Sequence, residues 1–254
     1  MIIGSKIFHK KSCYNSIEWA KENIEIAADG SIFLADIHEY THGRQDRIWQ
    51  SDLEQIKVSI LLKPEILSSY PEQILSTLNM ALTLSIFDTL KNYNLELNKI
   101  ELKWPNDFMY QNKKIGGVLF NLVWQETYPK AIIFSFAINV NNTFTKSNEL
   151  YNIATSLKQI LNKDINKQAL FTNLIKNIDK YYQKWLNLEF DNIYNLWSKN
   201  QNYIGKKIKI HNFDKTISYG LFKDVLQNGD MVFVDDQNNQ EKIISFYVIE
   251  QIDF

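Results

Sequence analysis

Hydrophobic and polar residues follow two different periods along the chain, and these periods predict an α+β fold. Continuous apolar runs between polar turns are typical of buried strands, and apolar residues three or four positions apart are typical of helices. A polar turn is expected from Lys10 to Asn15, and Ser16 is the predicted N-cap of the helix SIEWAKENI. The segment ILSTLNMALTLSIFDTL is apolar nearly all round, which predicts a central helix. Strands are predicted at 1–9, 31–37, 56–62, 100–104, 108–110, 115–124 and 130–140.

The period changes twice in the second half of the chain. Helical spacing is predicted from about 148 to 200, most clearly at Leu170, Leu174, Ile178, Tyr181, Tyr182 and Trp185. From Gly205 onward the runs KKIKI, TISYGLF, DMVFVDD and KIISFYVI alternate again, and they are too short for a sandwich, which favours a small barrel. The sequence therefore predicts a first domain at 1–200, with a sheet and helices, and a small all-β domain at 201–254.

Composition and charge narrow the class of protein. The chain has 254 residues, of which 45% are hydrophobic and 22% charged, as in ordinary globular proteins. Its 28 Lys and Arg nearly balance 29 Asp and Glu, so the basic stripe expected of a nucleic-acid-binding protein is not predicted. A single cysteine, Cys13, excludes an internal disulfide framework. Because neither a signal peptide nor a run of ~18 apolar residues is present, a soluble, cytoplasmic protein is expected.

The residue types of KWPND at 103–107 are not explained by a buried strand. Pro105 fixes its own φ and favours an extended Trp104, so the strand is expected to end there. Asn106 and Asp107 favour a turn, and their side chains can present oxygens to a ligand or to a metal ion. This turn is therefore a candidate for a binding site.

The residues that follow support the same interpretation. A hairpin is expected around residues 111–113, and Lys114 comes directly after it. Gly116 and Gly117 remove two side chains inside a strand, which usually marks a bulge or the close approach of a ligand. A lysine, exposed backbone amides and one acid suit an anionic ligand. A plain hairpin with an aromatic plug explains these residues equally well.

A second polar stretch, THGRQDRIWQS at 41–51, lies between two predicted strands. Gly43 gives a flexible backbone, and Arg44 and Arg47 can make forked contacts with phosphate or carboxylate groups. Trp49 can anchor the segment. It is a candidate for a lid that orders over a ligand, and a solvated surface loop is the alternative.

Together these stretches resemble the biotin protein ligases, which couple biotin to a lysine of a carrier protein. The motif KWPND is that family's own, and four further motifs, two before it and two after it in the chain, agree with the family's order. They are K-x-G-G-x-L at Lys114–Leu119, a Ser-Thr turn at Ser12–Cys13, R-x-W-x-S at Arg47–Ser51, and in outline G-x-G-I-N at Ser135–Asn139. The resemblance implies a catalytic domain like those of class II synthetases and a C-terminal SH3-like barrel.

The resemblance also implies an activity with two steps. Biotin reacts with ATP to give biotinyl-5'-adenylate and pyrophosphate, with Mg²⁺ assisting. A lysine of a biotin carboxyl carrier protein, as in acetyl-CoA carboxylase, then takes the biotinyl group and AMP is released. Both steps build up negative charge that positioned cations and N–H groups stabilise. ATP, Mg²⁺ and biotin are thus the expected cofactors and substrates, and the oligomeric state stays open.

Roles for individual residues follow from the same resemblance. Lys114, Arg44 and Arg47 would be catalytic, and Asp107 would support the loop or hold Mg²⁺. Trp104 is expected to pack and not to catalyse. The residues implied for biotin are Ser12, Cys13, His38, Tyr40, Thr41, Gly43, Arg44, Lys114, Gly117, Leu119 and Ala137. Those implied for the nucleotide are Arg44, Arg47, Trp49, Asn106, Lys114 and Asn139.

The sequence departs from the family's pattern at several positions. The loop HGRQDRIW is poorer in glycine and arginine than usual, and either His38 or Tyr40 takes the place of a usual glutamine. Ser135 and Ala137 replace glycines of the biotin pocket, so weaker biotin binding is expected. His38 has no cysteine or acidic partner at ligand spacing, and neither does His42, so no histidine metal site is predicted.

Other activities remain as alternatives to biotin ligation. A lipoate or octanoate ligase or transferase shares the broad fold, and KWPND with the C-terminal barrel argues against it. A family member that binds biotin without turnover is a second alternative, and a nucleotide-binding module without acyl chemistry is a third. Because the first predicted strand begins close to Met1, no DNA-binding module precedes it in this sequence and no sequence-specific DNA binding is expected.

Overall fold

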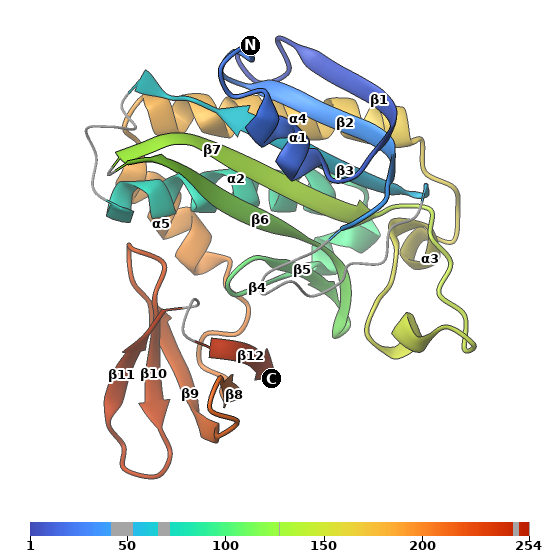
Figure 1. The fold of residues 1–254 in the computed structure, drawn as a ribbon. Helices are drawn as coiled ribbons and strands as arrows, with labels where there is room; N and C mark the ends of the chain where they lie inside the picture. The colour runs from blue at the N-terminus through green and yellow to red at the C-terminus, as the bar shows by residue number, and fades with distance from the viewer. Residues whose placement is uncertain (42–52, 66–71, 127, 246–248, 254) are drawn as a thin grey trace.

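The computed structural model describes residues 1–41, 53–65, 72–126, 128–245 and 249–253. It contains a seven-stranded mixed sheet, a five-stranded antiparallel sheet and five α-helices within these ranges (Figure 1). None of the helices in the described ranges combines the length and the apolar character that a membrane span needs. The α+β class predicted from the sequence is confirmed.

The large sheet has the strand order β1-β2-β3-β7-β6-β5-β4. β1 runs parallel to β2, and every other neighbouring pair is antiparallel. The predicted hairpin is present between β5 and β6, where Gln111 and Asn112 have positive φ. The strands are β1 (Ile7–Cys13), β2 (Ser31–His38), β3 (Gln55–Leu62), β4 (Glu101–Lys103), β5 (Asp107–Tyr110), β6 (Lys113–Gln125) and β7 (Tyr128–Asn139).

Helices cover the two faces of this sheet unequally (Figure 1). The main core lies between one face and the helices α2 (Glu72–Tyr93) and α4 (Lys167–Leu186), with α5 (Phe190–Lys199) beside α2. The described residues of α2 from Leu75 to Phe87 are almost all buried, as its nearly uniform apolar character predicts. The short helix α1 (Ser16–Glu22) covers part of the opposite face. The helix α3 (Leu157–Leu161) and two 3-10 helices at Leu95–Lys99 and Glu149–Asn152 complete the connections.

The N-terminal strand differs from its prediction. β1 spans Ile7–Cys13, so the prediction of a polar turn from Lys10 to Asn15 is wrong. β1 is an edge strand of the sheet, and an edge strand exposes most of its side chains and tolerates lysines. The apolar residues before it are not in the strand, and Ile2 and Ile3 donate their N–H groups to Asp179 instead. The N-cap of α1 is also not Ser16 but Asn15, whose side chain accepts from Ile17 N at 2.7 Å.

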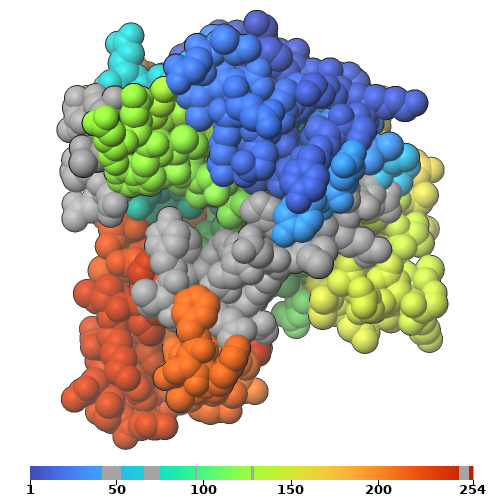
Figure 2. Space-filling model, in the orientation of Figure 1, coloured from blue at the N-terminus to red at the C-terminus, as the bar shows by residue number. Residues whose placement is uncertain are grey.

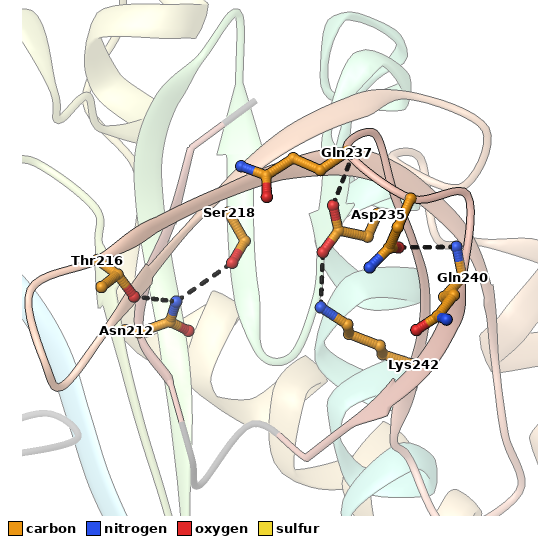
Figure 3. A network of polar contacts seen from close by, with 8 residues as sticks. Asn212, Thr216, Ser218, Asp235, Gln237, Gln240 and Lys242 are labelled. Carbon is orange, nitrogen blue, oxygen red and sulfur yellow. Dashed lines mark hydrogen bonds and ion pairs between the residues drawn. The ribbon is translucent and has the colours of Figure 1, made fainter.

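The second sheet has the order β11-β10-β9-β8-β12 and confirms a small all-β unit at the C-terminus. Its hairpins are held by local polar contacts (Figure 3). Asp235 accepts from Gln237 N at 2.9 Å and binds Lys242 Nζ at 2.6 Å, and the amide of Asn212 donates to the hydroxyls of Thr216 and Ser218. The strands are β8 (Lys207–Asn212), β9 (Ile217–Val225), β10 (Met231–Asp235), β11 (Glu241–Ile244) and β12 (Ile249–Asp253).

Trp104 joins the two sheets. It follows β4, its side chain is 1% exposed, and its indole N–H donates to Gly229 O at 2.9 Å. Its ring packs edge-on against Phe222 of β9 at 6.2 Å between centroids. Lys103 Nζ also donates to Ile252 O at 3.1 Å. The expectation that Trp104 serves packing is confirmed, and the turn after it is thereby fixed against the second sheet.

Candidate functional site

Polar residues gather on the sheet face that carries α1, at the end that α1 does not cover. Residues directly opposite in antiparallel strands share a face, so the register defines rows across the sheet. One row, here called the central row, consists of Lys57, Ala137, Gly117 and Asp107 on β3, β7, β6 and β5. Gln55 and Asn139 form the row on one side of it, and Ser59, Ser135 and Leu119 form the row on the other. The central row thus passes from a lysine over two small residues to an aspartate.

Lys114 lies over the aspartate end of this row. A bulge in the β5–β6 pairing breaks the alternation between Lys114 and Gly117, and so brings both to one face. Lys114 Nζ then forms an ion pair with Asp107 Oδ1 at 2.6 Å. A Cβ added at Gly117 would lie 2.9 Å from that oxygen and 3.3 Å from Lys114 Cε. The absence of a side chain at Gly117 therefore makes room for the ion pair.

The backbone of Lys114 is fixed from both sides. Its N–H donates to Ile153 O at 2.8 Å, and its carbonyl accepts from Thr155 N at 3.0 Å. The buried amide of Asn139 donates to Lys114 O at 3.4 Å and to Thr155 O at 3.0 Å, while its oxygen accepts from Gln55. The resemblance implies that Asn139 contacts the nucleotide. In this structure its amide group is hydrogen-bonded to the strand that carries Lys114.

The turn after Trp104 is bonded to β6 in a similar way. Asn106 donates its side-chain amide to Val118 O, and its own carbonyl accepts from Val118 N at 3.1 Å. Gly116 lets the strands approach closely on the other side, because an added Cβ would lie 2.4 Å from Ala137 O. A bulge, one of the two features that the glycines predicted, is therefore present in the β5–β6 pairing, and Gly116 also allows β6 and β7 to approach closely.

Buried polar residues lie near the lysine end of the central row, where the charge of Lys57 acts on both His38 and Cys13. His38 is 4% exposed and Lys57 is 6% exposed, and Cys13 is paired with His38 in the β1–β2 register. Both ring nitrogens of His38 are buried without a hydrogen-bond partner in the described structure. Burial, and then the charge of Lys57, lower the pKa of His38 to about 4. Burial also raises the pKa of the Cys13 thiol, so the thiol stays protonated at neutral pH.

Sequence reasoning missed Lys57. It stands between Ile56 and Val58 in the run IKVSILL, which predicts a strand buried on both faces. A lysine inside such a run is a signal in itself, since lysines are almost never fully buried without a partner or a function. The same argument applies to Gln55, which is also buried.

Because His38 is buried in its neutral form, the protein is expected to lose stability in acid. The unfolded chain binds the proton near pH 6.5 and the folded chain only near pH 4, so protonation favours unfolding in this window. Stability is unaffected by His38 above pH 6.5 and falls as the pH falls below that value, and the loss reaches about 2.5 kcal/mol at pH 4.5. The free energy of unfolding should be measured in urea at pH 7.5 and at pH 4.5. Between these two pH values, His38→Gln should lose about 2.5 kcal/mol less stability than wild type. The exposed His9→Gln is the control, and equal losses in all three proteins would contradict the prediction.

Other residues implied by the resemblance lie around this face. Ser12 is exposed and donates to Glu39 at 3.2 Å, so it lies on the opposite side of β1 from Cys13. Tyr40 stacks on Tyr14 with 5.6 Å between ring centroids. Leu119 packs against the apolar cluster under α1. Thr41 is half-buried at the end of the described segment.

Ser135 belongs to a chain of buried hydroxyls. Ser59 Oγ lies 2.9 Å from Ser135 Oγ and 2.8 Å from Ser16 Oγ, which links β7 and β3 to the start of α1. Ser135 is 8% exposed. Its hydroxyl is therefore satisfied inside the protein, which explains how a polar residue is accommodated there in place of a glycine.

Several predicted site residues lie outside the described residues, namely Gly43, Arg44, Arg47 and Trp49. Within the described residues, no group of three or more metal-ligating side chains is present. Asp107 is the carboxylate of the central row, and a single carboxylate suits Mg²⁺ that is bound mainly through substrate phosphates. Figure 2 shows the molecule from the side of α1, with the N-terminal strands in blue and the C-terminal sheet in orange and red.

Comparison with known proteins identifies the family. Residues 11–141, slightly more than half of the chain, match the model of the Biotin/lipoate A/B protein ligase family. The chain belongs to this family. The matched residues include β2 to β7 and the end of β1, so the central row and Lys114 lie inside the part that defines this biotin/lipoate ligase family.

Named relatives and solved structures agree with this assignment. The Bacillus spizizenii protein named Bifunctional ligase/repressor BirA is 26% identical over 221 residues, which are 86% of this chain and 66% of that protein. Arabidopsis thaliana Biotin–protein ligase 2 is 22% identical over 186 residues, 70% of this chain and 53% of that protein. The chain thus spans less than two thirds of these curated relatives. The structure of the Aquifex aeolicus biotin protein ligase in complex with biotin and ATP has a TM-score of 0.79 at 22% identity, with 98% of this chain and 99% of that chain covered, and it shows the shared fold.

Proposed function

We propose that this protein attaches biotin to a lysine of a biotin carboxyl carrier protein in an ATP-dependent reaction through biotinyl-5'-adenylate. The observation that carries the proposal is the position of Lys114 and Asp107 at the end of a row of small residues, inside the matched family region. Relatives named as biotin ligases and the fold shared with a ligase structure that holds biotin and ATP support it.

In the first step, a carboxylate oxygen of biotin attacks the α-phosphorus of ATP and pyrophosphate leaves. In the second step, a neutral lysine amine of the carrier attacks the acyl carbon, AMP leaves with the bonding electrons, and the amine gives up a proton. Lys114 would neutralise charge on the carboxylate and on the α-phosphate. Its fixed backbone and its ion pair with Asp107 hold the ammonium in place before the substrates bind, which lowers the reorganisation that the reaction requires.

Further roles follow the resemblance. Arg44 and Arg47 would order the loop over the adenylate and slow its hydrolysis. Asn106 and Asn139 would act on the nucleotide through the backbone that they hold. Mg²⁺ would be held by Asp107 together with the phosphates of ATP, and its charge would assist the departure of pyrophosphate. We place the enzyme in the cytoplasm.

One experiment distinguishes this proposal from two other functions. The family description includes lipoate ligases, and the unusual loop at 41–51 keeps binding without turnover open. The purified protein should be mixed with ATP, Mg²⁺ and either biotin, lipoate or octanoate, and pyrophosphate should be measured. Release with biotin, followed by biotinylation of an added carrier domain in mass spectrometry, is expected. Release with lipoate or octanoate would indicate the lipoate-type enzyme, and biotin binding without release would indicate a binding protein.

A further inference from the structure

We infer that Trp197 and Gln201 bind an internal water molecule at the point where the chain passes from α5 to the C-terminal sheet. The site lies beside β4, on the side of that strand opposite to β5, and it is separate from the central row. The inference goes beyond the proposed function and does not depend on it, because it concerns how the KWPND turn is held and not what reacts there.

The pattern of α5 predicts an apolar residue at the position of Gln201. Ile193 and Trp197 are the buried residues of this helix, and they are four positions apart. The helical path continues past the end of α5, since Gln201 N donates to Ser198 O at 3.0 Å. Because residues four positions apart share one face of a helix, Gln201 extends the buried face. A polar side chain therefore continues an apolar stripe.

Both side chains are buried with unpaired polar atoms. Gln201 is 5% exposed and Trp197 is 3% exposed. Neither amide atom of Gln201 has a hydrogen-bond partner in the described structure, and neither does the indole N–H of Trp197. Ser31, Asn121 and Asn142 each have one such atom, whereas here two neighbouring residues contribute three. Since an unpaired buried polar group destabilises the folded state, native proteins usually pair such groups with ordered water.

The three atoms indicate the kind of ligand. The indole of Trp197 can only donate, whereas the amide of Gln201 has two N–H donors and one acceptor oxygen. A metal ion would meet the donors and an anion would meet the acceptor, so the site favours a neutral molecule that can both donate and accept. Water has both functions at one atom. Buried waters typically make about three hydrogen bonds to groups that the protein leaves unpaired.

The site adjoins the strand that leads into the KWPND turn. Leu102 of β4 pairs with Phe108 of β5 on one side and forms an isolated bridge with Gln201 on the other. Asn202 closes this contact, because its N–H donates to Leu102 O at 3.3 Å and its side-chain oxygen accepts from Leu102 N at 2.9 Å. A water held by Trp197 and Gln201 would therefore connect α5 to the edge of the large sheet next to this turn.

Nuclear magnetic resonance on wild-type protein detects the water directly. The indole N–H signal of Trp197 is identified as the one that Trp197→Phe removes. The measurement is the rotating-frame Overhauser effect between this N–H and water, and a contact is expected. Its absence in wild type would overturn the inference even if the variants did not fold.

Thermal melting tests whether the two residues share the water. Gln201→Met keeps the length of the side chain and removes the amide, and Trp197→Phe removes the indole N–H. Each should lower the melting temperature by about 2–8 °C. The double variant should lose clearly less than the sum, since either change alone already removes the shared water. Gln168→Met on the exposed side of α4 is the matched control and should change the melting temperature by less than about 2 °C.

Two results of the melting experiment would contradict the inference. A rise in the melting temperature of Gln201→Met would show that the amide is unpaired in the folded protein. Additive losses in the double variant would show that Trp197 and Gln201 hold no common water. Neither result bears on the proposed ligase function, which the release of pyrophosphate tests separately.

Discussion

Lys114→Met is expected to slow the formation of biotinyl-adenylate by about 100- to 1000-fold while the protein remains folded, in line with the loss of one preorganised group that stabilises transition-state charge. The ammonium lies 2.6 Å from Asp107 and is partly exposed, so its removal takes away a positive charge that substrates can reach. A partly exposed ion pair contributes only ~1 kcal/mol or less to stability. The main effect should therefore fall on the rate and not on the fold.

Lys113→Met is the control for this variant. Lys113 precedes Lys114 in β6, but its Nζ donates to Tyr151 O at 2.7 Å and lies over the Tyr151 ring, away from Asp107. The measurement is the single-turnover rate of pyrophosphate release with saturating biotin and ATP, together with the thermal midpoint of each protein. Lys113→Met should react at a rate close to wild type. A wild-type rate in Lys114→Met, or an equal loss in both variants, would count against the role given to Lys114.

The fold was predictable wherever burial controls the sequence. The strands β2, β3 and β7 and the helix α4 were predicted because their apolar period reflects burial in the core. β1 was predicted in the wrong place because an edge strand with exposed lysines has no such period. The split of the run at 242–249 into β11 and β12 was also missed, since one apolar run can serve two strands that lie at opposite edges of a sheet.

The candidate site was predictable in part. Lys114, Asp107 and Gly117 were identified from residue types at a turn and from family motifs, and the structure brings these three together. The contact of Lys114 with Gly117 depends on a bulge, which no period in the sequence reveals. Lys57 was missed for a related reason. It lies on β3, 57 residues before Lys114, and only the β3–β7–β6 register places it in the same row as Gly117.

Position in the register also explains how the departures from the family pattern are accommodated. Ser135 lies in the row of buried hydroxyls, where Ser59 satisfies it. Ala137 lies in the central row between Lys57 and Gly117, where it is only half-buried. One substitution therefore changes internal bonding, and the other changes the surface over which a ligand would lie. Ala137 is therefore expected to weaken biotin binding more than Ser135 does.

Trp104→Ala should destabilise the protein by about 3–5 kcal/mol, as expected when a fully buried aromatic side chain is truncated. The indole fills the contact between the turn after β4 and the C-terminal sheet, and its N–H is bonded to Gly229 O. Trp104→Phe keeps an aromatic ring but leaves that carbonyl without its donor, so a smaller loss of about 1–2 kcal/mol is expected. Trp124→Ala is the control, because Trp124 is 48% exposed and should change stability by less than about 1 kcal/mol.

Urea unfolding followed by far-ultraviolet circular dichroism measures these effects without depending on tryptophan fluorescence. If Trp104 joins the two sheets, its loss should also reduce their cooperativity, and Trp104→Ala should unfold in a broader or a biphasic transition. Loss of stability with a single sharp transition would indicate that Lys103 and the shared core still couple the sheets. A loss below about 1 kcal/mol in Trp104→Ala would contradict the structural role. Because the same turn carries Asn106 and Asp107, the destabilised variant should also lose adenylate formation below its melting temperature, whereas Trp124→Ala should keep it.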